Sequence, residues 1–234
     1  MLSKSDIKRL GQLSHKKYRD ENGLFVVEGA KLVAEALASG FEIVERHTVD
    51  DIGEQAMSRI TLLSTPSPDF AVVRRPLADS GRACVDTSAL TLALDGLRDP
   101  GNVGTIIRLA DWFGVRHIIA SPDTVDIYNP KVVQATMGAI FRVKFSYCPL
   151  PDVLKGLDCP VYGTYMDGEN IYDAALAPRG VIVMGSEANG ISPEVGALVS
   201  RRLTIPAFNP GGSRCESLNV AIASAIVCSE FRRR

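Results

Sequence analysis

The chain has 234 residues, 46% of them hydrophobic and 23% charged, and its formal net charge is −1. These proportions are typical of a globular protein with a sizeable core and exclude long disordered stretches. No apolar run approaches the roughly 20 residues of a membrane span, and the N-terminus lacks an apolar stretch after its charges, so we expect a protein that is neither exported nor embedded in a membrane.

Residues 1–78 are predicted to form a small α/β domain. Ile7, Leu10 and Leu13 stand at helical spacing and predict a helix over 3–19. The pattern then predicts a strand over 24–27, a helix over 29–39 closed by Gly40, a strand over 42–49, and a further helix and strand ending near residue 75. The stretch 76–88 is rich in turn-forming residues, so we place a linker at 79–88 and a second domain at 89–234.

Basic residues concentrate at the two ends of the chain. The first cluster contains Lys4, Lys8, Arg9, Lys16, Lys17 and Arg19, and the second is Arg232, Arg233 and Arg234. Such clusters can bind phosphates even on a chain of slightly negative net charge. A solvated amphipathic helix and a frayed tail explain the same pattern equally well, so charge alone leaves both interpretations open.

Strands and helices alternate regularly in the second domain. Segments such as LTLALD (90–95) and GVIVMG (180–185) are apolar at nearly every position, as expected for parallel strands that helices cover on both faces. The predicted fold class is therefore α/β with an open, doubly wound sheet. Ligands of such sheets bind at the carboxyl ends of the strands, so the residues after each strand are the candidates for chemistry.

The segment RDPGNVGTIIR (98–108) follows the first of these strands. We expect Asn102 to cap the next helix, Gly104 to allow a close backbone approach at its first turn, and Arg108 to lie one turn further on the same face. An arginine near the strand ends suits a phosphate or a carboxylate. The alternative is an ordinary turn with a surface arginine.

Two later segments also place polar groups after strands. In MGSEANGISP (184–193), two glycines bracket Glu187, which either faces a ligand or accepts backbone hydrogen bonds within the turn. Near the C-terminus, Ser217 and Asn219 precede a helix of small and apolar residues. Helix capping by Ser217 explains one of these polar groups and leaves Asn219 unexplained.

The cysteines indicate a reducing compartment. They form no CxxC pair, and their odd number suits neither a disulfide framework nor a zinc site. We expect reduced thiols in a cytoplasmic protein without a bound metal, at Cys84, Cys148, Cys159, Cys215 and Cys228.

The order NxGxxxR, GxExxG and then IP followed by SLN resembles the three signature motifs of the SpoU/TrmH family of RNA 2′-O-ribose methyltransferases, in the SPOUT superfamily. These motifs span roughly residues 90–234. The segment HKKYRDENGLFVVEGAKLVAEAL (15–37) resembles the small substrate-binding domain that precedes the catalytic domain in many members. Together the two resemblances cover essentially the whole chain.

The resemblance implies a SPOUT-type parallel sheet with a C-terminal trefoil knot, preceded by a small α/β RNA-binding domain. It implies S-adenosyl-L-methionine as cofactor and a homodimer whose active site is completed at the subunit interface. The implied cofactor contacts are Thr164, Gly185, Ile205 and Leu218. The implied catalytic residues are Asn102, Arg108, Glu187, Ser217 and Asn219. The candidates for RNA binding in the N-terminal domain are Lys16, Lys17 and Arg19.

The implied activity is methylation of a ribose 2′-hydroxyl in structured RNA, with ribosomal RNA favoured over transfer RNA. Because a guanidinium with a pKa above about 12 is a poor base, we expect Arg108 to clamp a phosphate while Ser217 and Asn219 orient the hydroxyl. The stretch 207–216 is longer than in compact versions of the third motif, which leaves the cofactor contacts there open. The alternatives are a non-catalytic rRNA-binding protein, a small-molecule methyltransferase and a base methyltransferase.

Overall fold

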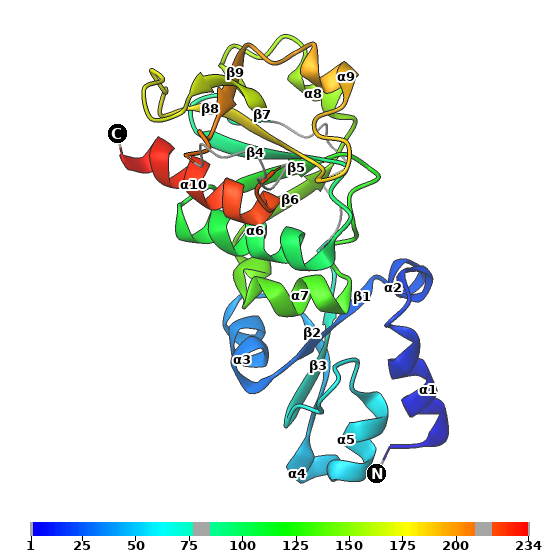
Figure 1. Cartoon of the computed structure of the whole chain (residues 1–234). Coiled ribbons are helices and arrows are strands. Elements are labelled where there is room, and N and C mark those ends of the chain that lie inside the picture. Colours follow the sequence, from blue (N-terminus) through cyan, green and yellow to red (C-terminus); the bar gives the residue numbers. More distant parts are fainter. Residues whose placement is uncertain (1, 77–84, 209–216, 234) are drawn as a thin grey trace. The chain divides into compact units, whose positions relative to one another are not determined.

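The computed structural model describes residues 2–76, 85–208 and 217–233 (Figure 1). The chain divides into two compact units. Unit 1 comprises Met1–Ala78 and Asp126–Arg142, and unit 2 comprises Asp79–Val125 and Val143–Arg234. No helix in the described ranges is long and apolar enough to cross a membrane.

Unit 1 is built on an antiparallel sheet of strand order β1-β3-β2. One apolar cluster joins α1 and α5 to one face of this sheet, and a second joins α3 and α7 to the other. Its elements are α1 (Lys4–Gln12), α2 (Lys16–Asn22), β1 (Leu24–Glu28), α3 (Ala30–Ala38), β2 (Ile43–Thr48), α4 (Val49–Ile52), α5 (Glu54–Ile60), β3 (Asp69–Arg74), α7 (Pro130–Thr136) and the 3₁₀ helix η1 (Ala139–Phe141).

The helix predicted over 3–19 is interrupted between α1 and α2. A capping box, in which the side chains of Ser3 and Asp6 accept from each other's backbone N–H, begins α1. The Arg19 guanidinium donates to the carbonyl oxygens of Leu13 (2.9 Å) and Ser14 (2.8 Å). These carbonyls accept from a side chain instead of a following helical turn, and periodicity alone did not predict the break.

The segment Asp126–Arg142 belongs to unit 1, although it lies inside the range expected for the second domain. Its Val133 and Ile140 pack in the same apolar cluster as Phe25. Its Asp126 carboxylate forms a buried ion pair with Arg19, at 2.7 Å. The helical period predicted α7, but which core receives its apolar face depends on tertiary contacts.

Unit 2 is an α/β unit whose described strands form one parallel sheet of order β6-β5-β4-β8-β7-β9. The predicted parallel α/β sheet is thereby confirmed. The elements are β4 (Leu90–Asp95), α6 (Pro100–Trp112), β5 (His117–Ala120), β6 (Lys144–Tyr147), α8 (Leu150–Leu154), β7 (Val161–Asn170), β8 (Gly180–Gly185), α9 (Pro193–Gly196), β9 (Arg201–Thr204) and α10 (Val220–Arg233).

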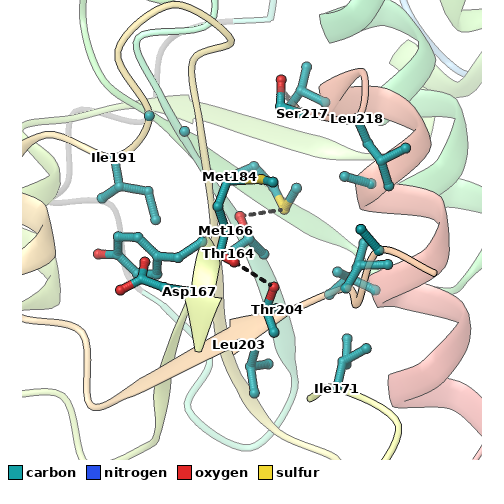
Figure 2. A pocket seen from close by; sticks show the side chains of 18 of the residues that line it. Thr164, Met166, Asp167, Ile171, Met184, Ile191, Leu203, Thr204, Ser217 and Leu218 are labelled. Atoms are coloured by element: carbon teal, nitrogen blue, oxygen red, sulfur yellow. Dashed lines mark hydrogen bonds between the residues drawn. The ribbon is translucent and has the colours of Figure 1, made fainter. Parts of the chain in front are cut away.

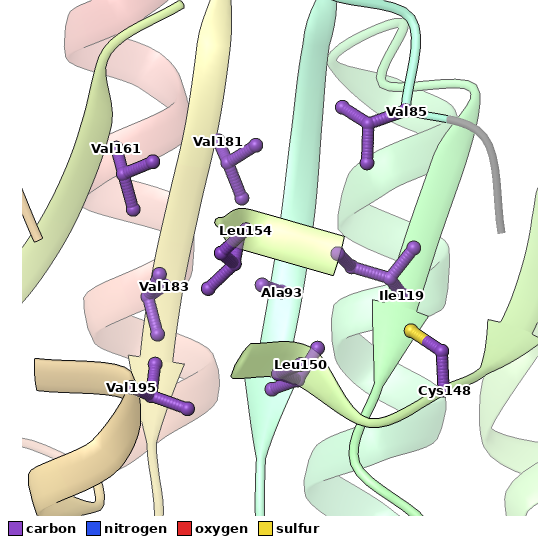
Figure 3. Close-up of a cluster of buried hydrophobic side chains, with 10 residues drawn as sticks. All are labelled: Val85, Ala93, Ile119, Cys148, Leu150, Leu154, Val161, Val181, Val183 and Val195. Atoms are coloured by element: carbon purple, nitrogen blue, oxygen red, sulfur yellow. The ribbon is translucent and has the colours of Figure 1, made fainter. Parts of the chain in front are cut away.

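Helices cover both faces of this sheet. On one face, α8 and α9 contribute Leu150, Leu154 and Val195 to a buried cluster with strand residues such as Val183 (Figure 3). On the other, α6 and α10 pack against each other and against β5 and β8. The strands β5 and β6 lie on one side of the neighbouring pair β4 and β8, and β7 and β9 lie on the other, so the strand order reverses between β4 and β8. The carboxyl ends of this pair, Asp95 and Gly185, are in register. Ligands of open α/β sheets bind at such a switch point.

Candidate active site

A pocket of about 720 Å³ lies in unit 2 at the carboxyl ends of β7, β8 and β9, beside the start of α10. Such a volume is typical of small-molecule sites, which span about 300–1,000 Å³. All four residues expected to contact the cofactor line it: Thr164, Gly185, Ile205 and Leu218. Figure 2 shows Thr164 near Met184, with Leu218 on the α10 side. The described part of the pocket wall is mostly apolar.

Gly185 allows two backbone segments to meet at the base of the pocket. A Cβ at this position would lie 2.2 Å from the carbonyl carbon of Gly190 and 2.4 Å from the nitrogen of Ile191. The turn between them is closed by two backbone hydrogen bonds that join Ser186 and Gly190, of 3.0 and 2.8 Å. A side chain would force this turn open, so glycine is required here.

Three predicted site residues form one hydrogen-bonded cluster, although they come from distant parts of unit 2. The Asn102 side-chain amide donates to Glu187 Oε1 at 2.9 Å. The Asn219 amide donates to Asn102 Oδ1 at 2.9 Å and to the same Glu187 oxygen at 3.0 Å. We call these residues the amide–carboxylate cluster. Glu187 accepts side-chain amides from other elements, which its role within the turn alone does not explain.

The structure corrects two predictions about helix capping. Asp99, not Asn102, caps α6, since its Oδ1 accepts from the Asn102 backbone N–H at 2.7 Å and Pro100 occupies the first turn. Asn219, not Ser217, caps α10, since its Oδ1 accepts from the N–H of Ala221 at 3.0 Å and of Ile222 at 3.2 Å. Asn219 therefore holds the helix with one side-chain atom and the cluster with the other.

Glu187 also connects the pocket to a smaller hollow of about 260 Å³. Both are lined by Ser186, Glu187 and Gly190, and the smaller one adds the exposed Arg98. The cluster thus lies where two hollows share a wall. Ser217 lines the larger pocket and is exposed.

Arg108 is exposed on α6, whereas Gly104, one turn earlier, is buried. Across the described residues, no hydrogen bond or ion pair engages its guanidinium. The structure therefore does not bring Arg108 into the amide–carboxylate cluster within one chain, and its donors are free for another partner.

The pocket wall includes residues that sequence reasoning missed. Tyr165, Met166 and Asp167 follow Thr164, and Phe208, 82% exposed, follows Ile205. Burial raises the pKa of the Tyr165 hydroxyl, which is neutral at physiological pH. The Asp-Gly step at 167–168 is a turn signal that could have marked this part of the chain as an interruption of the strand.

The three predicted RNA contacts differ in availability. Lys16 and Lys17 are exposed on α2, where Lys16 pairs with Asp20 at 2.5 Å and Lys17 lies 3.9 Å from Glu21. Arg19 is only 2% exposed and is engaged by its buried ion pair and two carbonyls. The prediction that Arg19 contacts RNA is therefore corrected: its guanidinium holds unit 1 together.

The described arginines of the C-terminal cluster bind neighbouring protein groups. Arg232 donates to the carbonyl oxygens of Phe113 (2.7 Å) and Gly114 (3.0 Å). Arg233 pairs with a carboxylate one turn earlier, at 2.7 Å. Arg234 lies outside the described residues, as do Cys84 and Cys215. Within the described ranges, no group of three or more histidine, cysteine or carboxylate side chains is arranged to hold a metal ion.

Comparison with known proteins relates both parts of the chain to RNA methylation. The model of the SpoU rRNA Methylase family matches residues 89–229, and that of the MRM3-like substrate binding domain matches residues 4–68. The 23S rRNA (guanosine(2553)-2′-O)-methyltransferase RlmP of Bacillus subtilis is 29% identical, over 97% of this chain and 95% of that protein.

Solved structures agree over the full length. A TrmH-family structure from Porphyromonas gingivalis is 42% identical, with a TM-score of 0.87 over 100% of this chain and 99% of the other. The AdoMet-bound rRNA methyltransferase of Sinorhizobium meliloti is 29% identical, with a TM-score of 0.87 over 100% and 97% of the two chains. The resemblance drawn from the three motifs is confirmed.

Proposed function

The chain belongs to the SpoU rRNA methylase family, and on that premise we propose that it transfers a methyl group from S-adenosyl-L-methionine to a ribose 2′-hydroxyl of ribosomal RNA. The observation that carries this proposal is the amide–carboxylate cluster of Asn102, Glu187 and Asn219, which borders a pocket of about 720 Å³. A group-transfer enzyme must bring two substrates together, and Glu187 lines two hollows.

The pocket fits the proposed cofactor in size and chemistry. Its apolar wall suits an adenine ring, and the turn closed at Gly185 leaves backbone groups, rather than side chains, at its base. We propose that Thr164, Gly185, Ile205 and Leu218 hold the cofactor. When bound, S-adenosyl-L-methionine supplies a methyl group activated by a sulfonium.

The chain's own residues would hold and polarise the acceptor. The cluster fixes Glu187 through two amide donors, so its carboxylate is held in one position. Ser217 adds a hydroxyl at the pocket rim and, with the cluster, would orient the ribose hydroxyl. Arg108 would clamp the neighbouring phosphate, since a guanidinium stays protonated and offers a fork of donors.

The RNA class follows from the relatives and from unit 1. The Bacillus subtilis relative is named for 23S rRNA, and residues 4–68 match a substrate-binding domain. We propose that this domain binds structured rRNA, with Lys16 and Lys17 among its phosphate contacts. Both lysines are exposed, and their carboxylate partners are on the surface, where phosphate can compete for them.

We further propose a homodimer with a C-terminal trefoil knot, located in the cytoplasm. An exposed apolar face supports the dimer: Trp112 on α6 is 83% exposed and Ile222 on α10 is 55% exposed, and these two helices pack together. A partner covering this face would approach the free Arg108 on the same helix. Light scattering with Ile222→Glu as the interface variant tests the dimer. Unpaired thiols at Cys148, Cys159 and Cys228 suit a reducing compartment.

Transfer of label from methyl-labelled cofactor to RNA tests the activity. The purified protein is incubated with total RNA, which is then separated into ribosomal and transfer RNA. We expect label in ribosomal RNA, in nucleotides that resist alkaline hydrolysis because their 2′-hydroxyl is methylated. Label in transfer RNA alone would indicate transfer RNA, not ribosomal RNA, as the substrate, and label in a base would contradict ribose methylation. RNA binding without any label would favour the non-catalytic alternative.

A further inference from the structure

The strand β7 is interrupted by a short excursion at the mouth of the pocket. Residues up to Thr164 pair with β9 as far as Leu203, and Glu169 then pairs with Leu203 again. The residues between, 165–168, are therefore extra to the ladder. They carry the side chains of Tyr165, Met166 and Asp167 along the pocket wall.

Several independent contacts hold this excursion in place. The Arg202 guanidinium stacks on the Tyr165 ring, with its Cζ 3.6 Å from the ring centroid. The Thr204 hydroxyl donates to the Met166 carbonyl at 3.2 Å, as Figure 2 shows. Gly168 lies so close to β9 that a Cβ would be 2.8 Å from the Arg202 carbonyl oxygen. The excursion is thus a defined element that contacts within the chain hold against β9.

The carboxylate of Asp167 is oriented by the same arginine. Arg202 Nη2 donates to Asp167 Oδ1 at 2.7 Å. Among the described residues, nothing donates to its other oxygen, Oδ2, and the side chain is 83% exposed. Figure 2 shows Asp167 and Ile191 on one side of the pocket and Leu218 on the other. One oxygen is therefore anchored, and the other is available at a mostly apolar pocket.

Only two carboxylates line the described part of the pocket, and they differ in engagement. Glu187 already accepts two amide donors in the amide–carboxylate cluster. Asp167 has a free acceptor and lies outside that cluster. A carboxylate beside an apolar nucleoside pocket commonly accepts hydrogen bonds from ribose hydroxyls, because a diol offers donors that apolar walls leave unpaired.

We propose that Asp167 is a specificity residue that accepts hydrogen bonds from the ribose hydroxyls of the cofactor's adenosyl group, with Arg202 as its positioning residue. This inference rests on the proposed function, since it takes the pocket to bind an adenosyl cofactor. It assigns Asp167 to recognition of the nucleoside and not to the transfer step.

Binding of 5′-methylthioadenosine and its 2′,3′-dideoxy analogue to the full chain tests this assignment by calorimetry. We expect Asp167→Ala to weaken 5′-methylthioadenosine about tenfold or more, as for the loss of a hydrogen bond to a charged acceptor. The dideoxy analogue should bind wild type and variant almost equally. Glu169→Gln is the matched control, because Glu169 pairs with Arg201 on the same two strands outside the described pocket lining, and it should leave both affinities unchanged.

The outcomes separate the inference from the proposed function. Equal weakening of both ligands by Asp167→Ala, or no weakening, would overturn the ribose assignment while leaving the cofactor pocket intact. A larger loss for S-adenosyl-L-methionine than for S-adenosylhomocysteine would also overturn it, since Asp167 would then recognise the sulfonium charge. Failure of the wild-type chain to bind any of these adenosyl compounds would overturn the proposed function as well. Thermal melts of the same variants check that each is folded.

Discussion

At Asn219, helix capping can be tested separately from the proposed role in methyl transfer, because its two side-chain polar atoms make different hydrogen bonds. Oδ1 caps α10 by accepting from two backbone N–H groups. Nδ2 donates to Asn102 and Glu187. Asn219→Ser keeps a good capping residue but cannot reach the other two side chains, whereas Asn219→Ala removes both functions.

The expected stabilities follow from the cap. Asn219→Ala should lose about 1 kcal/mol of unfolding free energy, which is a shift of about 2–4 °C in melting temperature for a chain of this size. Asn219→Ser should stay within about 0.5 kcal/mol of wild type. Both should lose methyl transfer by on the order of 100-fold, because the freed Glu187 no longer holds one position.

An introduced negative charge at position 219 gives a further test. Asn219→Asp retains the cap but places a second carboxylate against Glu187, where the present contact is 3.0 Å. Two like charges at such separations repel by about 1 kcal/mol in water and more where solvent is excluded. Adding Glu187→Gln restores a donor opposite the introduced carboxylate, so the double variant should be more stable than the sum of the two single effects predicts.

Urea unfolding and single-turnover methyl transfer are measured on these four variants and on Glu187→Gln alone, which the double-mutant comparison requires. The reasoning is refuted if Asn219→Ser transfers methyl groups at the wild-type rate, because the amide donors would then be unnecessary. It is also refuted if Asn219→Ser is destabilised as much as Asn219→Ala, because Oδ1 would then not act as a cap.

Three further predictions concern packing and burial. Gly185→Ala should abolish cofactor binding measured by calorimetry, since the added Cβ would lie 2.2 Å from a backbone carbon; wild-type affinity would contradict the close approach. Arg19→Ala should cost about 3–5 kcal/mol in urea unfolding, by leaving a buried carboxylate unpaired, against about 0–1 kcal/mol for Lys16→Ala at an exposed pair; similar losses would contradict the corrected role of Arg19. Burial raises the pKa of Glu28 above 4.5, because it disfavours the charged carboxylate in the folded chain. The protonated side chain therefore contributes fully to the unfolding free energy below pH 4.5, and this contribution is lost as pH rises through the raised pKa. Glu28→Gln should therefore match wild type in thermal melts at low pH and exceed its stability near pH 7, and a constant difference between the two would argue against this charge effect.

Features set by short stretches of sequence could be predicted. The apolar segments 90–95 and 180–185 are buried parallel strands, as their short length and nearly continuous apolar composition predict. Gly40 ends its helix with a φ of +80°, as expected for a glycine just after a helix. The polar segments 98–108 and 184–193 follow the carboxyl ends of β4 and β8, as the alternation of strands and helices predicted.

Features that depend on residues far apart in the sequence could not be predicted. Asn102 was expected to cap a helix, but Asp99 occupies that position and Asn102 instead donates to Glu187, 85 positions away. Ser217 and Asn219 are both good capping residues, and local propensity does not decide between them. The basic cluster in the sequence predicts a surface cation at Arg19, but its guanidinium is buried in an ion pair with Asp126, which lies far along the chain. In each case a long-range contact decided the role of a residue whose type alone allowed several.

Mapping of 2′-O-methyl groups in ribosomal RNA from cells with and without the gene tests the central claim most directly. We predict that one ribose methylation disappears without the gene and returns with the wild-type chain but not with Arg108→Lys, which keeps the charge and loses the forked donors. An unchanged methylation map, or full restoration of the lost ribose methylation by Arg108→Lys, would contradict the account.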